Sequence, residues 1–575
     1  MYRHSRYLTT LASAALASLA SAQNPQSIFV KVGSGPSATG GFSPTDPLPT
    51  LAEGIDAAKN LLAQGITQVT LRGLPGTYST TAPMPAHGIT LTAYDLPGGT
   101  GALPILTNQL VVNSLGNSAL PASTIEHLEF EAGITLDSGG EVQIRHCRFS
   151  YEQIDPQSSF GAVSTTRPVG SHSEHVIEFC QFEPKSAAPS QRNAFTGIRN
   201  KPSSALQGSS SLLIRANEFR NIETAVLVEG DINNQFANTT PRVFSNTMSL
   251  HERAASFEFS NPWFVNNSIY EFKAHNPALT TLNDDVYGVR FSECPTYSAT
   301  NNIIWFAPSA GVDRGDLFFE FSGVGTILTN ELEDNGAPNP WAGSTPVFPR
   351  IDMASPLATG GSLFQVIPAS SGGPAPVPNG AGGTVPVDVS IDFEGDMRST
   401  PVGANTLPAV AIGADQVVDL RISIVPGPTI DAYGNWYGDP SLTPTSPFTV
   451  HVQGALPGIG TKNAAIALLG VVLPNPQPLA LNPVDQHVFV GFIGSSTSSD
   501  LASTNVVPQV MPAAQLLGNG VTTTSFAVPG IQVPAARIGI KFYFQAISVG
   551  PVNGDPADGT LRGIASNRLE LRVNR

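Results

Sequence analysis

The stretch LLIRANEFRNIETAVLVEG, residues 212–230, contains a six-residue pattern that recurs along the chain. The pattern has an apolar first residue, a central fourth residue and an apolar sixth residue, as in Ile214, Asn217 and Phe219. The central residues of the matching hexamers are Leu128, Cys147, Cys180, Asn217, Asn246, Asn267 and Asn302. Counted along the numbering, they lie 19, 33, 37, 29, 21 and 35 residues apart. The shorter intervals are typical of one turn of a β-solenoid, and the longer ones leave room for inserted loops.

The central column predicts the corner of each coil. Asn tolerates the left-handed backbone of a corner, and stacked amides can bond one another between coils about 4.8 Å apart. We therefore expect a structural rather than a ligand-binding role for the Asn column. Cys147 and Cys180 fall in this column on successive coils, where they either form a disulfide or stack as two buried thiols. Strain in a pair stacked across coils favours free thiols.

Composition favours a β-rich, elongated protein. The 575 residues exceed one compact core, only 13% are charged, and Gly (55) and Pro (49) are abundant. The net charge of −15 is spread along the chain without a basic patch. This charge pattern disfavours binding to nucleic acid or to an anionic membrane surface.

The N-terminus has the features of an export signal over residues 1–22. Arg3 and Arg6 precede an apolar run at 8–19, and small residues at 20–22 form a cleavage site. No later stretch reaches the ~20 apolar residues of a spanning helix. We expect a secreted or cell-surface protein without a membrane span.

A helix is predicted just before the coils. Apolar residues at helical spacing run from Leu51 to Leu62, and Thr50 is a suitable N-cap. A strand, TQVTLRG, follows at 67–73. This helix would cover the open first coil, as repeat folds require.

Two segments resemble a known superfamily. SIFVKVGSG and LRGLPGTYS, within residues 27–79, resemble the start of secreted right-handed parallel β-helix proteins of the pectate-lyase-like superfamily. DFEGDMRS at 392–399 and AIGADQ at 411–416 resemble the segment that closes many bacterial members. Ala411 and Gln416 depart from that closing pattern, whereas these residues match it: Asp392, Gly395, Arg398, Gly413, Ala414 and Asp415.

The predicted fold is all-β with two parts. The resemblance implies a right-handed parallel β-helix over residues 23–420, followed by a linker at 421–434. Short apolar runs between Gly and Pro turns predict a C-terminal β-sandwich at 435–575. The last of these runs, FYFQAISVGP and ASNRLELRV, resemble C-terminal domains of exported bacterial proteins, especially from planctomycete-like bacteria.

Strand parity predicts one outward cluster. Val226 and Val228 on one strand and Phe257 and Phe259 on the next are assigned to the interior, because alternate residues share a face. The outward column then runs through Arg199, Leu227, Glu258 and Arg290, with Lys201 on the same side.

The superfamily resemblance suggests what this cluster would do. Polysaccharide lyases of this fold use Ca²⁺ or Arg and Lys to neutralise a uronate carboxylate, and a base to remove the neighbouring proton. Arg199, Lys201 and Arg290 could supply cation and base, with Glu258 orienting them. The alternative is an ion pair between Glu258 and Arg290 on a solvated face, which contributes about 0–1 kcal/mol.

Other polar and aromatic residues extend the candidate site. Glu229 with Asp231, and Asp284 with Asp285, could hold Ca²⁺ through oxygen ligands, although either group is also consistent with a polar loop. The Asp284 and Asp285 pair could instead contribute carboxylates to a glycoside hydrolase. Trp263 and Trp305 are candidates to stack on a sugar ring, because parity turns both side chains outward. The alternative is that inserted loops cover them.

The sequence thus predicts an exported protein that engages an extracellular polysaccharide or a cell-surface glycan. Two roles stay open. One is a lyase-like enzyme acting on uronate-containing glycans. The other is a non-catalytic carbohydrate-binding, adhesion or scaffold protein, and a cleft lined by Arg199, Glu258 and Arg290 would favour the enzyme.

Overall fold

A computed structural model describes the chain from residue 26 onward, with gaps. The first part covers 26–94, 102–113, 119–137, 140–150, 161–166, 175–183, 196–201, 210–220, 222, 224–230, 239–249, 253–270, 287–305, 316–328 and 330–332. The second part covers 350–351, 358–359, 376–378, 384–386, 413–414, 419–424, 435–436, 448–455, 465–471, 479–480, 487–488, 509–511, 522–528, 541–551, 561–565 and 569–573. The predicted signal peptide lies outside these residues.

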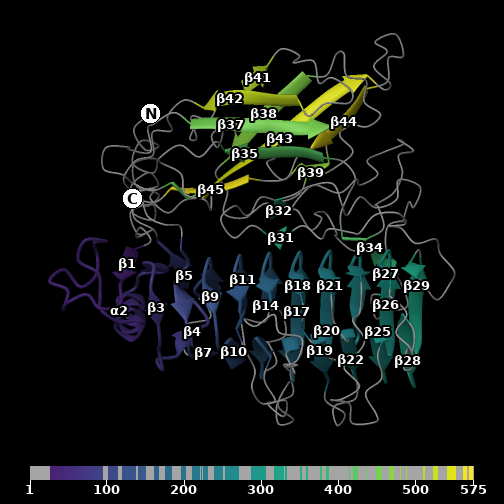
Figure 1. Cartoon of the computed structure of the whole chain (residues 1–575), viewed down its shortest axis with the longest axis horizontal. Coiled ribbons are helices and arrows are strands. Elements are labelled where there is room, and N and C mark those ends of the chain that lie inside the picture. The colour runs from purple at the N-terminus through teal and green to yellow at the C-terminus, as the bar shows by residue number, and fades with distance from the viewer. Residues whose placement is uncertain are drawn as a thin grey trace, which may run out of the picture.

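The first part winds through three parallel sheets in a fixed order (Figure 1). Sheet 1 contains β1 (Gln26–Val30), β2 (Val69–Gly73), β5 (Ile89–Ala93), β8 (Ser123–Glu126), β11 (Val142–Arg145), β14 (His175–Glu178), β17 (Ser210–Arg215), β20 (Thr239–Phe244), β23 (Trp263–Val265), β26 (Thr296–Thr300) and β29 (Val324–Leu328). Sheet 2 contains β3 (Thr77–Tyr78), β6 (Ile105–Leu106), β9 (Glu129–Phe130), β12 (Arg148–Phe149), β15 (Gln181–Phe182), β18 (Glu218–Arg220), β21 (Thr247–Ser249), β24 (Ser268–Tyr270), β27 (Ile303–Trp305) and β30 (Glu331–Leu332). Sheet 3 contains β4 (Met84–Pro85), β7 (Leu110–Asn113), β10 (Ile134–Asp137), β13 (Val163–Thr165), β16 (Thr196–Asn200), β19 (Thr224–Glu229), β22 (Arg253–Glu258), β25 (Tyr287–Ser292) and β28 (Leu317–Glu320).

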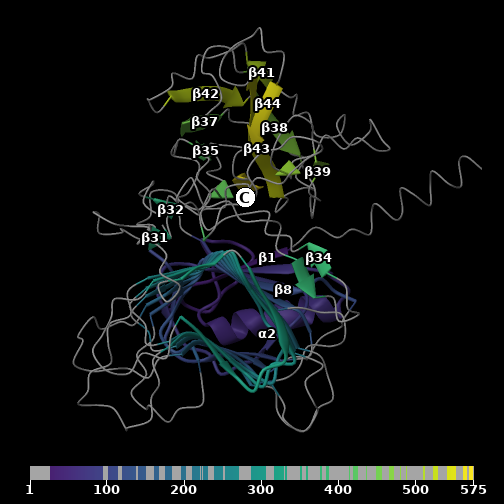
Figure 2. The same cartoon turned by 90° about the vertical axis from the view of Figure 1, so that its right-hand side faces the viewer.

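Each coil therefore passes from sheet 1 to sheet 2 to sheet 3 before the next coil begins. Figure 2 looks along the stack and shows the strands as the sides of one tube. The repeated order confirms the all-β class and is compatible with the expected parallel β-helix. Throughout, "solenoid" denotes this stack of coils.

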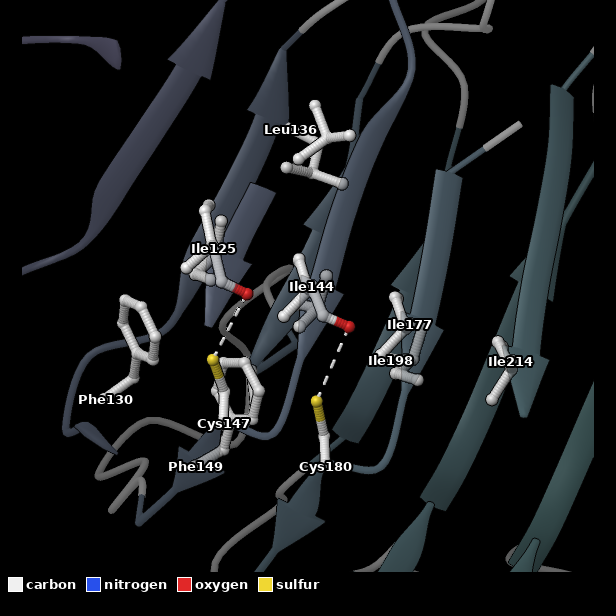
Figure 3. Close-up of a cluster of buried hydrophobic side chains, with 14 of the residues drawn as sticks. Ile125, Phe130, Leu136, Ile144, Cys147, Phe149, Ile177, Cys180, Ile198 and Ile214 are labelled. Atoms are coloured by element: carbon white, nitrogen blue, oxygen red, sulfur yellow. Dashed lines mark hydrogen bonds between the residues drawn. The ribbon is translucent and has the colours of Figure 1, made fainter. Parts of the chain in front are cut away.

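Inward side chains stack on like side chains of the neighbouring coils. Ile125, Ile144, Ile177 and Ile214 are in register on adjacent strands of sheet 1, and all four are fully buried (Figure 3). On sheet 2 the rings of Phe130, Phe149, Phe182 and Phe219 form a stack with centroids 5.2, 4.7 and 4.7 Å apart. The apolar positions of the repeated hexamer thus form the core of the solenoid.

The predicted helix is present as α2 (Leu51–Ala63). Its N-cap is Thr50, whose hydroxyl accepts a hydrogen bond of 3.2 Å from the backbone N–H of Glu53. Ile55 and Ala58 are fully buried against the first coils. In Figure 2, α2 lies across the interior of the tube, so the helix covers the first coil as expected.

The Asn column forms a ladder of side-chain amides along the corner between sheets 1 and 2. Asn217, Asn246, Asn267 and Asn302 each donate from Nδ2 to Oδ1 of the next amide, at 3.0, 3.0, 3.1 and 2.9 Å. The last acceptor is Asn330, which belongs to a matching hexamer that the sequence reading missed. The ladder confirms the structural role of the column.

One detail of the corner prediction is wrong. The left-handed backbone falls on the residue before each column position, not on the Asn itself. The residues with positive φ at this corner are His127, His146, Phe179, Ala216, Ser245, Asn266 and Asn301. These residues make the turn, and the Asn residues that follow them in the later coils do not have a positive φ.

Cysteines replace the amides in the earlier coils. The three cysteines of the chain are free and buried, in agreement with the preference for thiols. Cys147 Sγ lies 3.6 Å from the carbonyl oxygen of Ile125, and Cys180 Sγ lies 3.7 Å from that of Ile144 (Figure 3). Asn217 Nδ2 makes the equivalent bond to Ile177 O at 2.9 Å, so each thiol takes the donor role of an amide.

His175 is buried inside sheet 1 without a hydrogen-bond partner for either ring nitrogen in the described structure. Burial lowers the pKa of His175 from 6.5 to about 4. Its charged form is therefore disfavoured in the folded state.

We expect the folded protein to lose about 2 kcal/mol between pH 7 and pH 5 through His175. The folded pKa is depressed, so the unfolded state binds the proton first and stability falls as the pH drops below 6.5 towards about 4. Urea unfolding of the wild type and of His175→Leu at both pH values checks this. The prediction fails if the two proteins show the same pH dependence.

The remaining strands lie after residue 349. They are β31 (Arg350–Ile351), β32 (Ala358–Thr359), β33 (Pro376–Pro378), β34 (Thr384–Pro386), β35 (Asp419–Ile424), β36 (Asn435–Trp436), β37 (Phe448–Ala455), β38 (Ala465–Val471), β39 (Leu479–Ala480), β40 (His487–Val488), β41 (Gln509–Met511), β42 (Thr522–Val528), β43 (Lys541–Pro551), β44 (Leu561–Ala565) and β45 (Leu569–Val573). β35 crosses the expected boundary at residue 420 and pairs with β37 in an antiparallel sheet.

The chain returns to the solenoid at Gly413 and Ala414, within the closing segment identified from the sequence. Gly413 N–H donates to Asn301 O at 2.8 Å, and Ala414 N–H donates to Ser268 Oγ at 2.9 Å. Gly413 has φ +93° and an added Cβ would lie 2.7 Å from Ile303 Cδ1. The other matching residues of that segment lie outside the described part: Asp392, Gly395, Arg398 and Asp415.

Gly413→Ala is expected to lower the free energy of unfolding by about 1–3 kcal/mol and to expose the returning segment to proteases. The reason is that the backbone at Gly413 is left-handed and the added methyl group clashes with Ile303. Gly65→Ala is the matched control, since Gly65 has φ +95° but nothing within 4 Å of an added Cβ. Unfolding and limited proteolysis compare the two. Equal losses would show that the contact with Ile303 contributes nothing.

Candidate functional site

The outer face of sheet 3 carries a group of charged side chains that are at least partly exposed. These outward residues of the described structure are Arg199, Lys201, Leu227, Glu229, Glu258, Arg290 and Glu320, whereas Ser256 and Ser292 on the same face are buried. The outer face of sheet 1 has partly exposed residues as well, such as Arg242 and Trp263. A ligand can contact the exposed parts of the sheet 3 side chains.

Long connections lead into and out of the strands of sheet 3 along the chain. The corner between sheets 1 and 2 spans two residues, as between β17 and β18. Connections into sheet 3 contain the segments 151–160, 184–195, 271–286 and 306–315, and those out of it contain 167–174, 202–209 and 231–238. Insertions at both edges of one face are typical of a binding surface on a repeat protein.

The predicted column is offset by two residues on one strand. Val228 pairs with Phe257, so Glu258 lies opposite Glu229 rather than opposite Leu227. Phe259 is not an inward residue, because it has φ +46° and forms the corner after β22. Parity gave the correct side of the sheet for Glu258 but the wrong register, since Glu258 lies opposite Glu229 and Ser292.

Two outward columns result. One runs through Arg199, Leu227, Ser256, Arg290 and Phe318. The other runs through Glu229, Glu258, Ser292 and Glu320, and Lys201 follows β16 beside it. We call these residues together the sheet 3 charge ladder.

At one end of the ladder two cations share one carboxylate. Arg199 donates to Glu229 Oε2 from Nε at 3.1 Å and from NH2 at 2.9 Å. Lys201 Nζ lies 3.4 Å from Glu229 Oε1, and its side chain is 58% exposed. Glu229, expected as a metal ligand, is therefore an ion-pair partner of the two predicted catalytic cations.

At the other end one cation lies between two carboxylates. Arg290 NH1 lies 2.6 Å from Glu258 Oε1, and NH2 lies 2.6 Å from Glu320 Oε2. Burial lowers the pKa of Arg290, but the bond with Glu320 and the nearby Tyr287, Glu258 and Glu320 raise it more, so the net shift is upward. The expected pair of Glu258 and Arg290 exists, and Glu320 completes it.

Sequence reasoning missed Glu320 and a second ion-pair group on sheet 1. Arg145 Nε and Arg215 NH2 lie 2.7 and 2.5 Å from the carboxylate of Glu178, which is almost fully buried. Burial raises the pKa of Glu178, but the charges of Arg145 and Arg215 lower it more, to about 2. The sequence contains a signal for this group: Arg145, Glu178 and Arg215 each follow the first residue of a repeated hexamer, so charges of alternating sign occupy the same position in successive coils.

The remaining candidates do not join the ladder. Trp263 lies on sheet 1, where it is partly buried against Phe244, Val265 and Leu213. Trp305 ends β27 of sheet 2, and its side chain is outside the described part. Also outside it are Asp231, Asp284 and Asp285. Among the described residues no group of three or more His, Cys, Asp or Glu side chains is arranged to hold a metal ion.

No protein-family model matches the chain, and no curated protein matches it. Within the described ranges, no α-helix is both long and apolar enough to cross a membrane. Any functional inference therefore rests on the sheet 3 charge ladder and on the sequence.

Proposed function

We propose that this is an exported protein that binds an extracellular polysaccharide along the outer face of sheet 3 without cleaving it. The observation that carries the proposal is the pairing of every cation of the predicted catalytic set. Glu229 holds Arg199 and Lys201, and Arg290 is held by Glu258 and Glu320. A base that removes a carbon-bound proton must be deprotonated when it acts, whereas paired cationic side chains suit hydrogen bonding to sugar hydroxyls.

The second candidate is a lyase-like enzyme on uronate-containing glycans. One observation favours it: among the described residues, Arg199 and Lys201 both pair with the carboxylate of Glu229, so two positive charges face one negative charge there. In that mechanism Arg199 would neutralise the uronate carboxylate. Lys201, released from Glu229, would take the proton, and Arg290 with Glu258 would orient the next sugar. Calcium is a further expectation of this candidate only.

The family assignment belongs to the same proposal. The opening and closing segments of the first part support a right-handed coil of the pectate-lyase-like superfamily and a bacterial source. The antiparallel strands after residue 434 support a C-terminal β-sandwich. The C-terminal part would then attach or pack the exported protein rather than perform chemistry.

A glycan screen of the purified protein without residues 1–22 separates the two candidates. Binding is measured on immobilised polysaccharides, with and without Ca²⁺, while ultraviolet absorbance follows unsaturated uronate and a reducing-end assay follows hydrolysis. We expect binding without products. Product formation that is lost in Arg199→Gln and Lys201→Gln would establish the lyase, and a lack of binding to every glycan would overturn both candidates.

A further inference from the structure

Cys147 and Cys180 place two buried thiols one coil apart in the column that contains the amide ladder. The residues that follow them, on β12 and β15, pair directly in sheet 2. Their sulfur atoms lie at nearly the same distance from a carbonyl oxygen of the preceding coil, 3.6 and 3.7 Å (Figure 3). The two thiols therefore have the same orientation, and their sulfur atoms are separated by one coil spacing, ~4.8 Å.

This step of the column differs from the later ones, where an amide–amide hydrogen bond joins the coils, as from Asn217 to Asn246 at 3.0 Å. Each thiol instead donates to a backbone carbonyl. Burial raises the pKa of the Cys180 thiol, and the neighbouring Cys147 thiol raises it further. Only an ion with a high affinity for thiolate can displace these protons.

We infer that Cys147 and Cys180 form a buried two-coordinate site for a soft metal ion of the copper(I), silver(I) and mercury(II) class. Thiolate ligands select soft ions. Two metal–sulfur bonds of about 2.3 Å in a line span about 4.6 Å, which matches the coil spacing. A disulfide needs its sulfur atoms about 2 Å apart, so it fits this spacing less well than a bridging ion.

The surroundings of the pair favour two ligands over four. The next positions of the column are Leu128, whose side chain has no ligand atom, and Asn217, whose Oδ1 accepts from the backbone N–H of Cys180 at 2.9 Å. Among the described residues no further His, Cys, Asp or Glu side chain is arranged with the pair to hold an ion. Zinc, which takes four ligands in structural sites, is therefore disfavoured.

The binding step involves proton release and no change of oxidation state. Each thiol gives its proton to solvent, and each sulfur forms one bond to the ion. The bound ion would join the coils of β12 and β15 at the step of the column that has no amide–amide bond. The site is separate from the sheet 3 charge ladder and does not depend on glycan binding.

Cys294 provides a matched single thiol. It follows the left-handed residue of a corner, as the paired cysteines do, and its Sγ lies 3.5 Å from the carbonyl oxygen of Phe257 in the preceding coil. The equivalent positions of the neighbouring coils are Ser260 and Ser322. An ion at Cys294 would therefore have one sulfur ligand.

The test titrates the full exported chain, with its cysteines reduced, with silver(I), mercury(II) and zinc(II). Competition with a small dithiol measures affinity, and X-ray absorption counts the sulfur ligands. We expect Cys294→Ser, which contains only the pair, to bind one silver(I) or mercury(II) ion through two sulfur atoms and not to bind zinc(II). One sulfur ligand in this variant would overturn the inference, whether or not other variants fold.

Two further variants assign the ligands. Cys147→Asn and Cys180→Asn introduce the side chain that the later coils have in this column, and urea unfolding checks that each variant is folded. Each should weaken silver(I) binding on the order of 100-fold or more, because a sulfur ligand is lost. Cys294→Ser should bind silver(I) as tightly as the wild type. Wild-type affinity in both Asn variants would also overturn the inference.

Discussion

Glu178→Gln is expected to destabilise the folded protein by about 3 kcal/mol at pH 7, because two guanidinium groups then face a buried amide in place of a carboxylate. Arg145 and Arg215 both contact Glu178, whose side chain is 5% exposed. The free energy of unfolding in urea measures the loss. Glu258→Gln is the matched control on the accessible face, with an expected loss of about 0–1 kcal/mol.

The pH dependence gives a second measure of the same group. The folded pKa of Glu178 is about 2, below its ordinary value of 4.5. The stabilisation is therefore complete above pH 4.5 and is lost as the pH falls through this range towards about 2. Glu178→Gln should flatten the stability profile there. The prediction is wrong if Glu178→Gln and Glu258→Gln cost the same at pH 7.

Asn246→Ala is expected to cost about 3 kcal/mol, because it removes several buried hydrogen bonds and leaves their partners unsatisfied. Oδ1 of Asn246 accepts from the backbone N–H of Asn217 at 2.9 Å and from its Nδ2 at 3.0 Å. Nδ2 of Asn246 donates to Ile214 O at 3.1 Å and to Asn267 Oδ1 at 3.0 Å. Urea unfolding at neutral pH measures the change.

Asn246→Cys is the informative comparison. Cys147 and Cys180 occupy the same column and donate to the carbonyl of the preceding coil. A thiol at 246 should keep the bond to Ile214 O but should not accept from Asn217. The free energy of unfolding of Asn246→Cys should therefore lie between those of the wild type and Asn246→Ala. Equal losses of unfolding free energy for the two variants would show that the contact with the carbonyl of Ile214 does not contribute to stability.

The repeated hexamer was enough to predict the coils, because its apolar ends and central residue describe one corner and its two flanking strands. The helix over Leu51–Ala63 was readable from its N-cap and its apolar spacing. Register on sheet 3 was not readable in the same way. Alternation shows which side a residue occupies, but both registers of β22 place Glu258 outward, and only the corner at Phe259 selects between them.

The candidate site was predicted less completely than the fold. Arg199, Lys201 and Arg290 were correctly placed on one face, yet their partners were assigned from parity alone. Glu320 was missed because the hexamer that follows its strand, with Asn330 at its centre, was missed as well. The left-handed residue of each corner was also misassigned, since seven different positions tolerate that backbone here with side chains from Ala to Phe. Local sequence preference is too weak to locate it.

The amide ladder also gives the corner between sheets 1 and 2 a net dipole along the solenoid axis. From Asn217 to Asn302 every side-chain amide donates one N–H to the amide oxygen of the following coil, while its second N–H bonds a backbone carbonyl of the preceding coil. Their dipoles therefore add, as peptide dipoles do in a helix, with a partial positive end at the later coils and a partial negative end at the earlier ones. Each bond also polarises the next, so shortening the row from either end weakens the amides that remain.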